Sequence, residues 1–318
     1  MVALKVPKKE HDVHSVSMQH YGINRHEYEH PPAFFVSPDA PRSDNGAWER
    51  LELEHIIVFK QIMPVFQPIV SLEDGIIHGH ESLSRLVHGG RISNPEELFD
   101  KARIHGLTSE IEKLCREKAL SLARDTKLEG MIFLNVCPAL LHTEGHRPGF
   151  TAELLNHLGI EHSRVVFELT EKTLINDYDL FERGVAHYRS QGYRIAIDDL
   201  GDGYAGLKML SQVVPDYVKL ARFLVSNIDT SPTRQALADA LVCFSKKIGA
   251  KVIAEGIERP EELQYFRSIG TEYGQGYLLA RPTSVPVHTT SIDLSGYYDT
   301  ADIKSGHLHC RLSRTACA

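Results

Sequence analysis

The chain has 318 residues, of which 42% are hydrophobic and 24% charged, as is typical of a folded globular protein. Its formal net charge of −7 argues against a protein that holds long nucleic acid by neutralising phosphates, but allows a small anionic ligand in a metal-lined pocket. The cysteines form no CxxC pair, which favours a reducing, cytoplasmic compartment. The sequence has no apolar run of membrane-spanning length and no signal-peptide core, so we expect no membrane insertion.

The two ends of the chain differ in character from its middle. Residues 1–50 combine scattered histidines and prolines without periodicity, and residues 286–318 also lack a clear period. His11 and His14 could bind a metal, but histidines in a polar terminus are more often solvated. We therefore expect a poorly ordered N-terminal arm and a C-terminal tail.

The first clear helix signal in the middle of the chain is an N-terminal cap. Asn94, Pro95 and Glu97 predict the start of a helix that ends near Gly106. Further helical stripes precede the strand-like runs MIFLN, YRIAIDD and AKVIAEG, and another stripe follows Pro260.

Helices that alternate with single strands predict parallel strands joined by right-handed crossovers. About seven or eight such units fit in residues 51–285 and favour an α/β fold of the closed (β/α)8 type. An open doubly wound sheet is the alternative fold.

A polar residue follows each strand-like run. In a barrel the carboxyl ends of all parallel strands lie at the same end, and barrel enzymes place their active sites there. Any one of these residues alone is best interpreted as an exposed loop residue, but several acids at equivalent positions would repel one another without a cation. The residues are Glu81, Asn135, Glu168, Asp198, Asp199, Lys219 and Glu255.

Carboxylates and an amide oxygen are hard ligands, which favour Mg²⁺ or Mn²⁺, and the lack of histidine and cysteine among them argues against zinc. The adjacent Asp198 and Asp199 could serve two ions at once. A two-metal site activates water and stabilises the attacking and leaving oxygens of a phosphoryl displacement, so the pattern predicts a metal-dependent phosphodiesterase.

A GxGxxG pattern at Gly201, Gly203 and Gly206 matches the dinucleotide-binding fingerprint. Asp198 and Asp199 precede it directly, so a bare pyrophosphate would meet negative charge there. We interpret the segment as a flexible active-site loop.

Several motifs together resemble the EAL-domain family of bacterial cyclic di-GMP phosphodiesterases, from about residue 55 to about residue 285. FQPIV resembles the opening strand of the family, and ESLSRL at Glu81 to Leu86 stands where the EAL-x-R motif occurs. The other motifs follow in the order of the family: LNVCP, FELTE, IDDLGDGY, PDYVK, AEGIE and GQGYLLARP.

The resemblance implies a modified (β/α)8 barrel that hydrolyses cyclic di-GMP to linear pGpG, with two Mg²⁺ or Mn²⁺ ions and a homodimeric assembly. It implies that one ion is held by Glu81, Asn135, Glu168 and Asp198. It implies that Asp198 and Asp199 hold the second ion, that Lys219 positions the attacking water and that Glu255 is the general base. The implied substrate-binding residues are Gln67, Ser82, Leu83, Arg85 and Gln275. Glu171, Gly201, Gly203 and Glu258 would form or brace the loop.

Two residues depart from the pattern of the family. Ser82 replaces an alanine, a conservative change, and Ala221 stands where the family commonly has the aspartate of a KID motif. Because of Ala221, a catalytically weak receptor that binds cyclic di-GMP and acts through a protein partner remains the alternative to an active enzyme. A metal-free barrel that serves only as a scaffold would require the acidic set to be accidental.

Overall fold

The computed structural model describes residues 45–87, 89–137, 149–170, 178–201, 206–285 and 291–297. Most of the predicted arm (residues 1–50) and tail (residues 286–318) therefore lies outside the described residues. The last six residues of the predicted arm begin the first helix.

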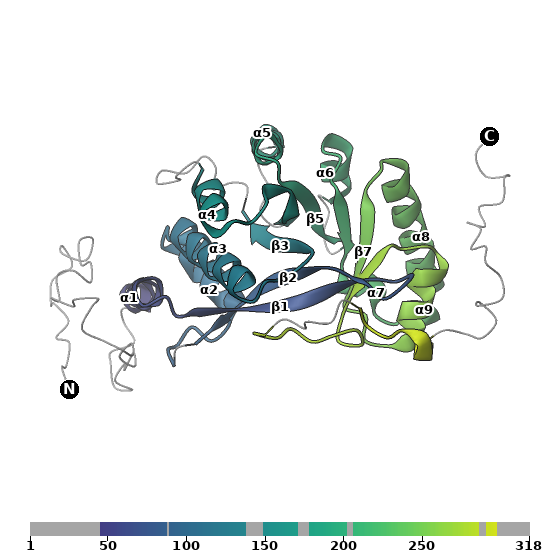
Figure 1. Ribbon diagram of the computed structural model, residues 1–318, viewed down its shortest axis with the longest axis horizontal. Coiled ribbons are helices and arrows are strands. Elements are labelled where there is room, and N and C mark those ends of the chain that lie inside the picture. Colours follow the sequence, from purple (N-terminus) through teal and green to yellow (C-terminus); the bar gives the residue numbers. More distant parts are fainter. Residues whose placement is uncertain are drawn as a thin grey trace. The chain divides into compact units, whose positions relative to one another are not determined.

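The strands form a closed barrel in chain order (Figure 1). β2 to β8 pair in parallel, and β1 pairs with β8 in antiparallel orientation. A short turn joins β1 to β2 in place of a crossover helix, with the amide of Ser71 donating to the carbonyl of Ile76 at 2.8 Å. The α/β barrel prediction is thus confirmed, and the open sheet was the wrong alternative. The strands are β1 (Ile62–Ser71), β2 (Ile77–Leu86), β3 (Met131–Val136), β4 (Val165–Thr170), β5 (Arg194–Leu200), β6 (Tyr217–Leu220), β7 (Lys251–Glu255) and β8 (Tyr273–Gln275).

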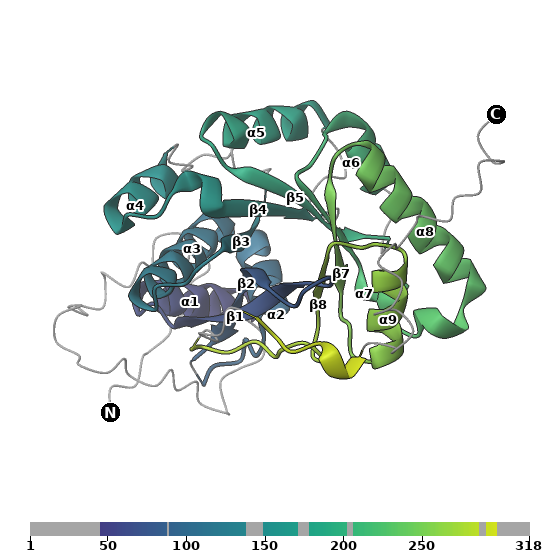
Figure 2. The same ribbon diagram turned by 45° about the vertical axis from the view of Figure 1, so that its right-hand side comes forward.

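The helices follow the strands as the alternating pattern predicts. Figure 2 shows α5, α6 and α8 along the outside of β5 to β7, which they contact. Within the described residues, no helix has both the length and the apolar character needed to cross a membrane. The helices are α1 (Asn45–Val58), α2 (Pro95–Ile104), α3 (Thr108–Asp125), α4 (Phe150–Leu158), α5 (Tyr178–Ser190), α6 (Gly206–Gln212), α7 (Arg222–Val225), α8 (Pro232–Lys247) and α9 (Pro260–Ser268), with 3-10 turns η5 (His162–Arg164), η7 (Ile228–Thr230) and η8 (Ser295–Tyr297).

The start of α2 matches the predicted cap. The side chain of Asn94 accepts a hydrogen bond from the amide of Glu97 at 2.9 Å, and the carboxylate of Glu97 accepts one from the amide of Ser93 at 3.0 Å. Pro95 occupies the first turn, where its missing N–H is not needed. The local sequence therefore fixes the start of this helix.

The chain divides into two compact units, Met1–Met63 with Ser84–Lys118, and Pro64–Leu83 with Ala119–Ala318. The first unit has its own core, formed mainly by α1, α2 and the first half of α3. The second unit contains most of the barrel and two apolar clusters. The larger cluster packs helices onto strands, and the smaller one consists of Ile69, Phe133, Val166, Ala196, Tyr217 and Ile253.

Candidate active site

The smaller apolar cluster of the second unit determines where the polar side chains lie. Side chains two residues apart on a strand point to the same face, so residues two positions from each cluster member share its side of the barrel wall. This alternation places a polar layer next to the apolar one, at the carboxyl ends of the parallel strands. The polar layer comprises Gln67, Asn135, Glu168, Asp198, Lys219 and Glu255.

Lys219 is the centre of the polar layer. Its Nζ lies 2.6 Å from Glu168 Oε1, 2.7 Å from Glu255 Oε1, 3.2 Å from Asp198 Oδ1 and 3.5 Å from Glu81 Oε2. The side chain of Lys219 is only 1% exposed and that of Glu168 is fully buried. Four acids from β2, β4, β5 and β7 thus contact one ammonium group from β6.

The charges of this cluster perturb one another strongly. Burial raises the pKa of Glu168 well above its ordinary value, although Lys219 opposes this shift. Burial also raises the pKa of Glu255, again against the effect of Lys219. For Lys219, burial alone would lower the pKa, but the surrounding carboxylates, led by Asp198, raise it well above its ordinary value. The acids therefore outnumber the available positive charge, and a cation would relieve their repulsion.

A local irregularity in β5 explains how two adjacent aspartates reach the same site. In a regular strand Asp198 and Asp199 would point to opposite faces. The register between β5 and β6 shifts between Ile197 and Leu200, and Asp199 has a left-handed backbone with φ 57°. Such bulges re-aim side chains, and aspartate is one of the non-glycine residues that adopt this left-handed conformation most readily.

The residues present fit a divalent cation. Asp198, Asp199 and Glu255 each offer a carboxylate oxygen, and these oxygens lie within 4.8 Å of one another. Among the described residues, neither carboxylate oxygen of the buried Glu168 has a partner in hydrogen-bond geometry, although Oε1 is ion-paired with Lys219. An all-oxygen donor set of this kind suits Mg²⁺ or Mn²⁺.

A chain of amide side chains holds Glu81 in place. Nε2 of Gln275 donates to Glu81 Oε2 at 2.6 Å and to Gln67 Oε1 at 3.0 Å. Gln67 in turn donates to the carbonyl of Ala280 at 3.1 Å. Asn135 makes a longer contact of 3.4 Å with the other oxygen of Glu81. The resemblance predicts that Gln67 and Gln275 bind substrate. In the structure the two side chains contact each other, and Gln275 also contacts Glu81, a predicted metal ligand.

The remaining predicted substrate-binding residues lie on β2. Ser82 and Leu83 follow Glu81 and are partly buried. Arg85 belongs to the other compact unit, where it is exposed and donates to the carbonyl of Ser84 at 2.8 Å.

Of the four residues predicted to form or brace the loop, the structure describes two. Gly201 has φ 109°, and an added Cβ there would lie 2.6 Å from the side chain of Leu224, so the position requires glycine. Glu258 is ion-paired with Arg222 at 2.9 Å. Glu171 and Gly203 lie outside the described residues.

The structure adds two features that the sequence pattern did not reveal. Glu255, predicted to be a base, groups with Asp198 and Asp199 as a possible metal ligand. The direct contact of Lys219 with four acids was also not predicted, because strand order gives the neighbourhood of a side chain but not its distances.

Comparisons with known proteins agree with this geometry. The EAL domain profile matches residues 51–282. The protein named probable cyclic di-GMP phosphodiesterase PdeN from Escherichia coli (strain K12) is 28% identical over 236 residues, or 73% of this chain and 45% of PdeN. The blue light- and temperature-regulated antirepressor BluF of the same organism is 31% identical over 169 residues, or 52% of this chain and 42% of BluF. The chain thus spans less than half the length of either relative.

Solved structures show the same barrel. The calcium/cy-diGMP complex of Klebsiella pneumoniae BlrP1 at pH 8.0 superposes with a TM-score of 0.64 at 30% identity, covering 70% of this chain and 56% of that one. The manganese/cy-diGMP complex of BlrP1 at pH 9.0 gives a TM-score of 0.63 at 29% identity, with the same coverage of both chains. Since the EAL profile also spans more than half of its residues, this chain belongs to the EAL domain family.

Proposed function

We propose that this protein is a metal-dependent phosphodiesterase that hydrolyses cyclic di-GMP to linear pGpG. The observation that carries the proposal is the convergence of Asp198, Asp199 and Glu255 within 4.8 Å, beside the buried ammonium of Lys219. Membership of the EAL domain family supports this assignment, as do the cyclic di-GMP complexes of BlrP1.

Two Mg²⁺ or Mn²⁺ ions would be held by the acidic residues. Asp198 would contribute to both sites and Asp199 to the second. Bound ions would supply activation of water and neutralisation of the charge that develops on the phosphate. The other ligands of the first ion would be Glu81, Asn135 and Glu168.

The remaining side chains of the site would position the reactants and move the proton. Glu255 would accept the proton of the attacking water, since burial raises the pKa of its carboxyl group and makes it a stronger base than an exposed carboxylate. Lys219 would keep its proton, because the surrounding carboxylates raise its pKa, and would orient that water by donating to it.

Substrate contacts would come from the strand ends around the acids. The guanidinium of Arg85 suits a phosphate, because it can donate to two oxygens at once. Gln67, Ser82, Leu83 and Gln275 would contact the remainder of the nucleotide. The loop that contains Gly201 and Gly203 would border the site, braced by Glu171 and Glu258.

We further propose that the protein acts in the cytoplasm as a homodimer, with residues 51–285 as the catalytic domain between an arm (1–50) and a tail (286–318). A second candidate function is that of a cyclic di-GMP receptor with weak turnover. It is favoured by Ala221 in place of the aspartate that is common in the family, and by the likeness to BluF, which is named an antirepressor.

Incubation of the purified chain with cyclic di-GMP and Mg²⁺ or Mn²⁺, with pGpG followed by chromatography, tests the proposal. We expect metal-dependent product formation that is lost in Glu81→Ala and strongly reduced in Glu255→Ala. Glu261→Gln is the matched control, because Glu261 is exposed on α9 and pairs with Arg259. Tight binding of cyclic di-GMP without turnover would replace the enzyme with the receptor, and neither binding nor turnover would refute both.

A further inference from the structure

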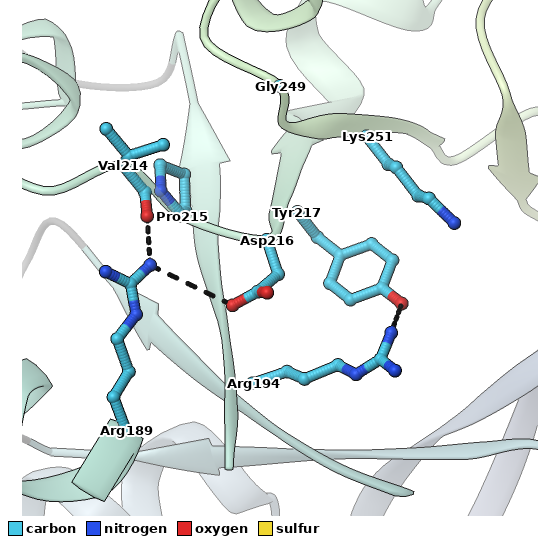
Figure 3. A pocket seen from close by; sticks show the side chains of 8 residues that line it. All are labelled: Arg189, Arg194, Val214, Pro215, Asp216, Tyr217, Gly249 and Lys251. Carbon is cyan, nitrogen blue, oxygen red and sulfur yellow. Dashed lines mark hydrogen bonds and ion pairs between the residues drawn. The ribbon is translucent and has the colours of Figure 1, made fainter. Parts of the chain in front are cut away.

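A cavity lies at the opposite ends of the strands that carry the acids. This cavity of about 320 Å³ opens where β5, β6 and β7 begin, and the first residues of these strands line it (Figure 3). These residues are Arg194, Tyr217 and Lys251. The acidic cluster is carried further along the same strands, at their carboxyl ends.

The cavity is rich in positive charge. Arg194 donates from Nη1 to the hydroxyl of Tyr217 at 3.3 Å, and Nζ of Lys251 donates to the hydroxyl of Tyr273 at 3.2 Å. Among the residues that the structure describes, no carboxylate lies within ion-pair distance of Arg194 or Lys251. Figure 3 shows Arg194 meeting the hydroxyl of Tyr217, and Lys251 lying on the same side of the cavity.

The acid in the cavity wall is already engaged. Oδ2 of Asp216 accepts a hydrogen bond from the amide of Ile195 at 2.9 Å and lies 3.9 Å from Nη2 of Arg189. Arg189 also donates to the carbonyl of Val214. Asp216 is therefore engaged by Arg189 and by the amide of Ile195, and in the part of the chain that the structure describes no carboxylate forms an ion pair with Arg194 or Lys251.

A half-buried histidine, His78, lies beside these groups. Burial is the main cause that lowers the pKa of His78 to about 4, and the charges of Lys251 and Arg194 make smaller contributions to this shift. His78 Nε2 lies 2.9 Å from the hydroxyl of Tyr217, and its ring stacks on Tyr273 with centroids 4.1 Å apart. Burial also raises the pKa of Tyr217, so its hydroxyl stays neutral. Of the residues that line the cavity, Tyr217 is thus buried and held by a neighbouring ring, whereas Lys251 is exposed.

We propose that this cavity binds a small phosphomonoester. A guanidinium and an ammonium without acidic partners provide charge-assisted donors for phosphate oxygens. Val214 and Pro215 line another part of the cavity and provide an apolar surface for the organic group. The volume lies at the lower end of the range of about 300–1,000 Å³ for ligand pockets, which limits the ligand to a small molecule.

Titration calorimetry with inorganic phosphate and with phenyl phosphate tests the proposal. EDTA is kept in the buffer, because without a metal ion the carboxylates of the candidate active site repel phosphate. We expect saturable binding of both probes by the full chain, tighter for phenyl phosphate, and none of phenol. Arg194→Gln and Lys251→Gln should each weaken binding by about tenfold or more. Lys247→Gln is the matched control, because Lys247 is an exposed lysine at the end of α8.

Two outcomes would overturn the proposal. One is the absence of saturable binding of phenyl phosphate by the wild-type chain. The other is an affinity for phenyl phosphate that is the same in Arg194→Gln and Lys251→Gln as in the control Lys247→Gln. Because Lys251 is exposed, its substitution should leave the fold intact, which the thermal midpoint of each variant would verify. Turnover of cyclic di-GMP is not part of the readout, so failure here is separable from failure of the proposed function.

Discussion

Lys219 Nζ and Glu168 Oε1 lie 2.6 Å apart with both side chains buried, so this ion pair has almost no contact with water. Removing two charges from water is costly, and the pair persists because further carboxylates also contact the ammonium. Lys219 therefore acts as an internal counterion for the acids of the site.

Replacement of Lys219 by methionine should destabilise the metal-free protein. The change leaves buried carboxylates without their cation, and breaking a buried ion pair typically costs about 3–5 kcal/mol. We expect a loss of this order in the free energy of unfolding, measured by urea denaturation in EDTA. Addition of Mn²⁺ should recover part of the loss, because a bound cation takes over the neutralisation.

The control for this experiment is Lys247→Met, which removes an exposed lysine from α8. Its free energy of unfolding should change by less than about 0.5 kcal/mol. If Lys219→Met were as stable as this control in EDTA, the internal counterion role would be wrong.

The sequence predicts the position of the acids better than their geometry. Glu168 and Glu255 could be assigned to one barrel mouth because each follows a strand-like run, and strand ends in a barrel share one side. The approach of Asp199 to the same site was predicted, but the backbone geometry that brings it there was not. That geometry consists of the bulge in β5 and the left-handed backbone of Asp199, and an aspartate in an IDD run carries no signal for either.

The cavity at the other end of the barrel was missed for a related reason. Arg194 and Lys251 stand at the beginning of their strand-like runs, away from the carboxyl ends where a barrel is expected to place its chemistry. Only the three-dimensional arrangement shows that they share a wall with Tyr217.

Introduction of an aspartate at Ala221 should raise turnover. Ala221 follows β6 two residues after Lys219, is 2% exposed, and has an extended backbone with φ −55° and ψ 145°. A carboxylate there restores the aspartate that is common in the family. We expect an increase in kcat for cyclic di-GMP hydrolysis in Mn²⁺, measured by release of pGpG.

Ala221→Asn separates charge from shape, because asparagine has nearly the same size as aspartate but no negative charge. It should leave kcat near the wild-type value. An equal increase in both variants would mean that the carboxylate is not the cause, and no increase in either would mean that Ala221 does not limit turnover.

Gln275 and Gln67 should contribute to stability as a coupled pair. Their side chains share a hydrogen bond of 3.0 Å, and Gln275 also donates to Glu81. Gln67→Ala and Gln275→Ala should each lower the free energy of unfolding, and the double variant should lose less than the sum by about 0.5–3 kcal/mol. A double-mutant cycle of urea denaturation in EDTA measures this coupling, and strict additivity would argue against the link.

Burial of His80 should make the protein less stable in mild acid. His80 is 4% exposed, lies edge-on to Phe66 with ring centroids 6.4 Å apart, and has its pKa lowered by burial from 6.5 to about 4. The unfolded chain therefore binds a proton between pH 6.5 and pH 4 that the folded chain does not, so the free energy of unfolding falls as the pH falls through this window. Relative to His80→Leu, wild type should lose about 2 kcal/mol of its free energy of unfolding between pH 7 and pH 5, measured by urea denaturation in EDTA.

The comparison with His80→Leu cancels the titration of the acidic site, which both proteins share. His157→Gln is the control for an exposed histidine on α4 and should follow the wild-type curve. Parallel pH curves for wild type and His80→Leu would show that His80 binds its proton equally well in the folded and unfolded chain.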